Sequence, residues 1–325
     1  MSYVPPNQPF DFGEAMIQPF RTSGGADFAK RLWFWVTIPI ALALIIAVPM
    51  IAPHFGGTLV WQAEYMEAMA SGAEPGAEMF SEMWAAFKPV MPGYGVMLLG
   101  MWIAAIMGEA ALHRKVLLGT EFAGRPVRFG ADEFRVLGAQ LSVWTLIYIM
   151  MVLGLTLAIM FSALIGAVLG AVGAALAAFS MLPVFYFAIH YSVRLIPASA
   201  LSVKEGSLRV LSARHISKGR FWPLFGAFLL VYIGGTIIST VITQLGYLIV
   251  FGGNPAAEAI LPDADIPVIM EDAARRIKNP LVILGGVLCV VAYAALISIW
   301  FLCLSGIGTY AVRNVQGEDV TATFD

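Results

Sequence analysis

The sequence predicts an all-α, polytopic integral membrane protein with six transmembrane helices, and three features carry this prediction. Hydrophobic residues make up 59% of the 325 residues and charged residues only 12%, whereas an ordinary soluble domain has about 25% charged residues. Long stretches contain almost no charge, and the Lys and Arg residues gather in alternate loops. This composition excludes a soluble domain.

The apolar stretches set the number of membrane crossings. A membrane-spanning helix needs roughly 20 mostly apolar residues, and five stretches of the chain reach that length. One of them, 136–193, holds 58 residues without Lys, Arg, Asp or Glu, which is enough for two crossings joined by an apolar turn near Ser162 to Gly170. The predicted helices are 33–52, 91–112, 137–161, 169–193, 222–250 and 281–308.

The basic residues predict the direction of each crossing. If 1–32, 113–135, 194–221 and 309–325 are the cytoplasmic segments, they hold 15 of the 19 Lys and Arg residues, as the positive-inside rule requires. We therefore expect a cytoplasmic N-terminal amphipathic segment at 1–32, a domain of three helical hairpins at 33–308 and a cytoplasmic tail at 309–325. Both termini are then cytoplasmic.

Short interfacial helices are expected before several membrane helices. Asp11 with Glu14, and Ser202 with Glu205, have the spacing of a capping box, so each pair is expected to begin a short helix. The lead-ins also share a boundary tryptophan, which has two explanations: a threefold repeat of surface helix and transmembrane hairpin, or the common chemistry of membrane entry. These tryptophans are Trp33, Trp144 and Trp222.

The outer loops also contain amphipathic patterns. Within 77–88, large apolar side chains recur at i, i+3, i+4 and i+7, which indicates a helix, and 61–70 is expected to form a companion helix. Pro267 is expected to open a helix that runs toward Lys278. We interpret these helices as ordered loops that cover the bundle, and the alternative is a surface that docks a partner.

Basic side chains lead directly into the fifth predicted membrane helix. In the simplest interpretation they hold the start of this helix on the cytoplasmic face and contact anionic headgroups, each contact contributing on the order of 1 kcal/mol. A tryptophan at the boundary favours the membrane interface. The alternative is a specific ligand or partner contact. The predicted headgroup contacts are Arg209, Arg214, Lys218, Arg220 and Trp222.

Few ionisable residues lie within the predicted helices, and each is a candidate for function because charge is costly in the membrane. Glu109 and His113 share one helix face at i, i+4, and His190 precedes Arg194 by four residues. Three hypotheses are open: pairing between helices with Arg194 as a partner, handling of a proton or ligand, and metal binding. No fixed spacing of metal ligands is present, so we expect no metal and no other cofactor.

A polar stripe follows the fifth predicted helix. Hydrogen bonds between helices explain such a stripe, and the alternative is that it lines a polar cavity. Its members are Thr236, Thr240, Thr243 and Tyr247, with Ser239 and Gln244 beside them. Motifs of hydrolases, metalloproteases and nucleotide-binding enzymes are absent: the sequence contains no HExxH, no GxSxG, no Walker-type loop and no GxGxxG before a helix. We expect no catalytic residues.

Residues 207–230, SLRVLSARHISKGRFWPLFGAFLL, resemble a pattern in a broad group of bacterial six-helix membrane proteins. The group includes the membrane domains attached to some glycerophosphodiester phosphodiesterases. The catalytic barrel of those fused proteins has no counterpart in this chain, so the resemblance carries over no active-site residue. It implies a bacterial inner-membrane location and a membrane-organising or accessory role.

Together, these observations predict a non-enzymatic accessory or scaffold protein of the inner membrane. Its expected partners are membrane lipids, and also another membrane protein or a second copy of the chain; nucleic acid is not among them. The alternative function is a transporter of a small solute or lipid that uses the polar stripe of the fifth helix together with Glu109 and His190.

Overall fold

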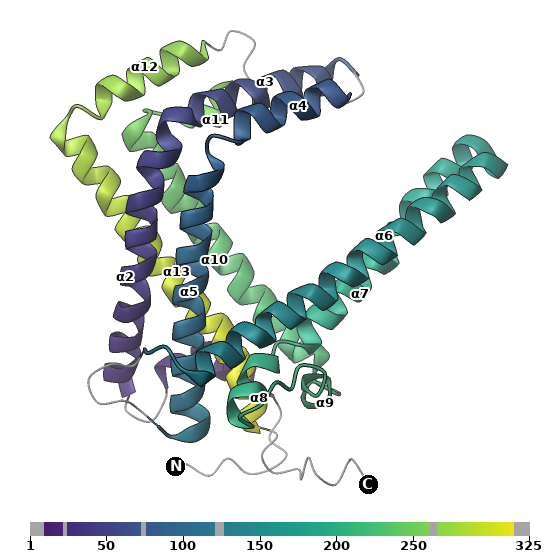
Figure 1. Ribbon diagram of the computed structural model, residues 1–325, viewed down its shortest axis with the longest axis vertical. Helices are drawn as coiled ribbons and strands as arrows, with labels where there is room; N and C mark the ends of the chain where they lie inside the picture. The colour runs from purple at the N-terminus through teal and green to yellow at the C-terminus, as the bar shows by residue number, and fades with distance from the viewer. Residues whose placement is uncertain (1–9, 22–24, 73–75, 121–126, 260–264, 315–325) are drawn as a thin grey trace. The chain divides into compact units, whose positions relative to one another are not determined.

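The computed structural model describes residues 10–21, 25–72, 76–120, 127–259 and 265–314 (Figure 1). Every regular element within these ranges is a helix, which confirms the predicted all-α class. The first nine residues and the part of the predicted tail after residue 314 lie outside them. Six helical runs are long and apolar enough to cross a membrane: Ala26–Ala70, Met91–Leu118, Ala131–Ala167, Met181–Lys204, Phe221–Val250 and Pro280–Asn314.

The chain divides into two compact units. The first unit comprises 1–32, 106–232 and 301–325, and the second comprises 33–105 and 233–300. The first unit contains the N-terminal ends of two long helices and the C-terminal ends of two others, as expected for helices that alternate in direction. These four helices are α2 (Gly25–Ile51), α10 (Phe221–Val250), α5 (Met91–His113) and α13 (Pro280–Asn314).

The long uncharged stretch forms the helical pair α6 (Ala131–Phe179) and α7 (Met181–Arg194), which lie side by side in the first unit (Figure 1). The helical conformation of α6 is interrupted at Gly170, the last residue of the predicted turn, where φ is 58°. Glycine adopts this backbone conformation at no steric cost because it lacks a Cβ. Gly170 therefore divides the uncharged stretch into two helical parts.

Short elements complete the first unit. The helix α1 (Phe12–Ile17) is followed by the 3-10 turn η1 (Gln18–Phe20), and α5 continues into the π-helical turn η3 (Arg114–Leu118). Two more short helices, α8 (Ala198–Lys204) and α9 (Ala213–Ile216), precede α10. Their buried faces share an apolar core with α1, α7, α10 and α13, which includes Ala15, Val193, Leu201, Leu224 and Ile307.

One of the two predicted helix starts is confirmed and the other is wrong. The carboxylate of Asp11 accepts a hydrogen bond from the backbone N–H of Glu14 over 3.1 Å at the start of α1. Ser202, in contrast, lies near the end of α8, where its hydroxyl donates to the Ala198 carbonyl over 2.7 Å. The capping-box spacing also occurs inside helices, where a serine commonly bonds to the carbonyl four residues earlier.

The second unit contains the elements of the outer loops. The 3-10 turn η2 (Ala52–His54) leads into α3 (Phe55–Ala70), and α3 and α4 (Ala77–Phe87) pack side by side (Figure 1). After α10 come α11 (Pro255–Ala259) and α12 (Ile266–Arg276), and both contact α3. The helices expected within 77–88 and after Pro267 are confirmed, and the companion helix is longer than the expected 61–70.

Only part of the apolar stripe on α4 is buried. The ring of Phe87 contacts Trp61 of α3 at a centroid distance of 5.5 Å. Phe80 and Trp84 are both more than half exposed. The α4 helix therefore packs on α3 through Phe87 among other residues, while two of its large side chains remain exposed.

Close contact between α6 and α7 depends on Gly154. A Cβ atom at this position would lie 2.7 Å from Val184 Cγ1. We expect Gly154→Ala to lower the midpoint of thermal unfolding in detergent, because overpacking at a helix contact typically costs about 1–3 kcal/mol.

Gly166→Ala is the matched control on the same helix, because a Cβ there meets no atom within 4 Å. It should preserve or slightly raise the unfolding midpoint. Equal midpoints for the two variants would contradict the close approach at Gly154.

Candidate functional site

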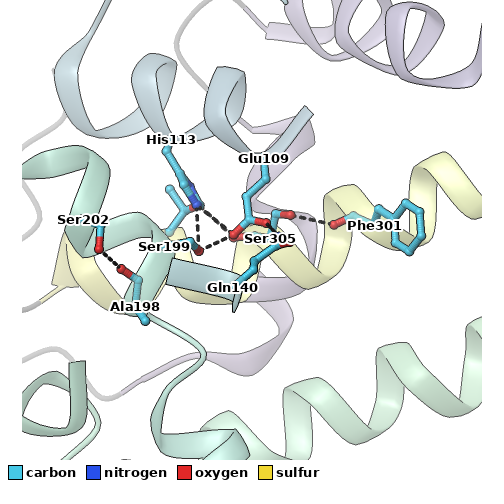
Figure 2. A network of polar contacts seen from close by, with 9 residues as sticks. Glu109, His113, Gln140, Ala198, Ser199, Ser202, Phe301 and Ser305 are labelled. Carbon is cyan, nitrogen blue, oxygen red and sulfur yellow. Dashed lines mark hydrogen bonds and ion pairs between the residues drawn. The ribbon is translucent and has the colours of Figure 1, made fainter. Parts of the chain in front are cut away.

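A buried polar network surrounds Glu109 near the C-terminal end of α5 (Figure 2). The Ser199 hydroxyl donates to Glu109 Oε1, and Gln140 Nε2 donates to Glu109 Oε2 over 2.6 Å. His113 Nε2 lies 3.1 Å from Glu109 Oε1 and 3.2 Å from Ser199 Oγ. Both carboxylate oxygens therefore have partners, and these partners come from α5, α6 and α8.

The other side of the His113 ring faces α13. His113 is fully buried, and its Nδ1 lies 2.9 Å from Thr309 Oγ1. The Thr309 hydroxyl donates to the Ser305 carbonyl over 2.8 Å, which leaves the threonine oxygen free to accept from Nδ1–H. A second hydrogen on Nε2 would make His113 and Glu109 an ion pair. The network thus connects α5, α6, α8 and α13.

The geometry of this network is typical of structural stabilisation. Each polar group is satisfied inside the protein, as buried polar groups must be. The spacing of Glu109 and His113 predicts that they share one helix face. No sequence pattern predicts that Gln140, Ser199 and Thr309 join them. Hydroxyl and amide side chains far apart in the chain become partners only after the helices pack.

A second buried network, which the sequence analysis missed, begins at Arg114. Its guanidinium is 3% exposed, and Nη1 lies 2.6 Å from Glu133 Oε1 and 3.5 Å from Asp132 Oδ2. Arg135 Nη1 lies 2.6 Å from Asp132 Oδ1. Acidic residues in the first turn of a helix are common because they interact favourably with the helix dipole, so no sequence pattern pairs these two with Arg114.

His190 does not join the Glu109 network. Its ring stacks on Phe221 at a centroid distance of 4.8 Å and on Tyr186 at 5.8 Å. Its Nδ1 is buried without a hydrogen-bond partner among the described residues. The three-residue cluster considered from the sequence is thus divided into the Glu109–His113 pair and a histidine in an aromatic stack.

Arg194 also lies away from Glu109. Its Nη2 donates to the Arg214 carbonyl over 2.9 Å, and its Nε donates to Ser217 Oγ over 3.4 Å. The Ser217 hydroxyl in turn donates to the Arg194 carbonyl over 3.0 Å. Arg194 therefore attaches the end of α7 to the chain around α9, and it does so through neutral acceptors.

Part of the polar stripe of α10 faces outward within the second unit, while Ser239, Thr243 and Tyr247 are half-buried. Thr240 and Gln244 are exposed, as is Thr236. The hydroxyl of Thr243 donates to the Ser239 carbonyl over 2.9 Å, four residues earlier on the same helix. The hydroxyl of Ser239 donates to the Thr236 carbonyl over 2.9 Å. These bonds are intrahelical, whereas the sequence analysis expected bonds to another helix.

The predicted headgroup residues lie in the loops around α9 and at the start of α10. We call residues 209–220 the basic segment. Arg209 pairs with Glu205 over 2.9 Å, while Arg214 and Lys218 are exposed. Arg220 has a buried Nη1 with no hydrogen-bond partner in the described part of the chain.

Trp222 follows the basic segment in the first turn of α10 and is 74% exposed. Exposure of a large amphipathic ring beside cationic side chains suits a membrane interface.

No family model, no curated protein and no solved structure matches this chain. The chemistry of the candidate sites therefore rests on their geometry. In the described ranges, no group of three or more His, Cys, Asp or Glu side chains is placed to hold a metal ion.

Removing Glu133 should destabilise the protein strongly. Glu133→Ala removes the 2.6 Å partner of the buried Arg114 guanidinium, and loss of one partner of a buried ion pair costs about 3–5 kcal/mol. The midpoint of thermal unfolding in detergent measures this loss. Glu271→Ala is the control, because Glu271 is 71% exposed and lies 4.0 Å from Arg275; its midpoint should not change.

Removing Glu109 should also lower the unfolding midpoint. Glu109→Ala removes the acceptor of the buried Ser199 hydroxyl and a polar neighbour of the buried His113, and each unsatisfied buried group costs about 1–3 kcal/mol. Thr240→Val, on the exposed stripe of α10, should change the midpoint little. A midpoint for Glu109→Ala equal to that of the unmodified protein would contradict the structural role of the network.

Proposed function

We propose that this chain is a non-enzymatic accessory or scaffold protein of a membrane, which acts by binding lipid or another membrane protein. The observation that carries this proposal is the basic segment. It joins cationic side chains, of which Arg214 and Lys218 are exposed, to an exposed tryptophan at the start of a candidate membrane-crossing helix. This combination suits contact with anionic headgroups.

The interior of the first unit supports a role without catalysis. Glu109 and His113 have hydrogen-bond partners within the protein, and their side chains are only 12% and 0% exposed. An acid or base that served catalysis would need access to a substrate. The buried polar groups are better explained as ties between helices.

A location in the bacterial inner membrane with cytoplasmic termini is part of the proposal. The bias of 15 of the 19 Lys and Arg residues toward alternate loops supports this orientation. The grouping of alternating helix ends in the first unit is consistent with it. The bacterial location rests on the resemblance of residues 207–230 to six-helix membrane proteins.

Affinity purification from native membranes in mild detergent, followed by mass spectrometry of lipids and proteins, tests the proposed function. We expect an anionic lipid enriched over the bulk membrane, or one membrane protein in a fixed ratio to the chain. A purified protein without either, combined with solute flux in proteoliposomes that Thr240→Val or Gln244→Leu abolishes, would instead establish the transport alternative.

A further inference from the structure

An apolar groove lies between α6 and α7 in the first unit. Its volume is about 1020 Å³, at the upper end of the range of ligand pockets. Its lining is almost entirely hydrocarbon and aromatic, and it flanks the point where Gly154 contacts Val184. Residues that line it include Met150, Leu157, Phe161, Val184, Phe187 and Tyr191.

A second hollow, of about 620 Å³, lies between α6 and the start of the basic segment. Its walls include Leu146 of α6 and Leu208, Arg209 and Leu211 of the loop before α9. Residues four apart lie on one helix face, so Leu146 of this hollow is followed on the same face of α6 by Met150 and Gly154 of the groove. The two hollows therefore follow one face of α6.

The α7 wall of the groove also leads to the basic segment. Phe187, Tyr191 and Arg194 are spaced by four and three residues, so they share one face of α7. Arg194 is hydrogen-bonded to the Arg214 carbonyl, and Val210 and Val143 of α6 both pack against the buried cluster that includes Ala213. The basic segment is thus fixed to both helices at the end of the groove.

The acidic residues of α6 and of the end of α8 pair with arginines other than Arg214, Lys218 and Arg220. Asp132 and Glu133, the only acidic residues of α6, pair with Arg114 and Arg135. Glu205 pairs with Arg209. No other Asp or Glu occurs between residues 134 and 257.

Arg220 is partly exposed, although its Nη1 is buried and has no partner within the described residues. A guanidinium donates strong, charge-assisted hydrogen bonds to phosphate oxygens, and the exposed part of this side chain can reach one.

We propose that the groove and the basic segment form one binding site for an anionic phospholipid. The phosphate lies against Arg214, Lys218 and Arg220, and an acyl chain lies along the groove between α6 and α7. This inference rests on the proposed lipid-binding function and identifies both the class of lipid and its position. The cationic end of the site complements the charged headgroup of an amphiphilic lipid. The apolar groove at the other end complements its acyl chain.

The experiment uses the full chain purified in a mild, uncharged detergent and stripped of native lipid. Dioleoyl phosphatidylglycerol, dioleoyl phosphatidylcholine, glycerol 3-phosphate and inorganic phosphate are added separately. Bound ligand is counted by native mass spectrometry, and the unfolding midpoint is measured in parallel. We expect saturable binding of phosphatidylglycerol with a stoichiometry of one, and much weaker binding of the other three.

Two variants test the two parts of the site. K218Q/R220Q removes two headgroup charges and should weaken phosphatidylglycerol binding about thirtyfold, at the usual strength of such contacts. Leu157→Trp fills the groove from an exposed position and should also weaken binding. K218R/R220K preserves both charges and should bind phosphatidylglycerol as the unmodified protein does. This result would show that K218Q/R220Q weakens binding through the lost charges and not through a folding defect.

Each variant has a matched control. R275Q/R276Q removes two exposed charges of α12, outside the first unit. Leu153→Trp places the same bulk on an exposed part of α6. Neither control should change phosphatidylglycerol binding.

The outcomes separate this site from the broader proposal. Phosphatidylglycerol binding that K218Q/R220Q leaves intact would overturn the headgroup assignment, and binding that Leu157→Trp leaves intact would overturn the groove; lipid binding by the protein would stand in both cases. Equal binding of glycerol 3-phosphate or inorganic phosphate would assign the basic segment to a soluble phosphate and overturn the lipid. No lipid retained by the unmodified protein would overturn both the site and the proposed lipid-binding function.

Discussion

Polar groups on membrane-crossing helices must find partners inside the protein, because hydrocarbon offers none. The network around Glu109 meets this constraint in the first unit. Four helices each contribute to it, and His113 is fully buried at its centre. The ion pair between Arg114 and Glu133 meets the same constraint one residue further along the chain. These contacts fix how the ends of the helices pack, and the short helices around them depend on that packing.

The same constraint also bears on the charge of the basic segment. Carboxylates on the neighbouring helices pair with other arginines, so none of these described carboxylates is left for Arg214, Lys218 and Arg220. Within the first unit, the buried Arg114 is neutralised by Glu133, whereas Arg214 and Lys218 are exposed to a surrounding that can supply negative charge. A protein that binds anionic headgroups needs this distribution, because a headgroup can supply the missing charge only where the protein does not.

The sequence was sufficient for most of the fold. Hydrophobic length predicts each of the six candidate spans, and the break at Gly170 lies within the predicted turn. The sequence was less informative about the polar residues. Ser202 has the spacing of a helix start but lies near the end of α8, and His190 lies in an aromatic stack apart from Glu109. Spacing along one helix predicts which residues share a face, but it does not predict what that face contacts.

Hydrophobicity and charge are properties of local stretches, so the sequence by itself determined the helical class, the six candidate spans and the position of the basic segment. The partners of Glu109 come from residues 31 and 90 positions further along the chain, and no local pattern connects them. The groove between α6 and α7 likewise exists only because two helices approach at Gly154. Tertiary structure decided these features, because contacts between distant residues depend on how the helices pack against one another.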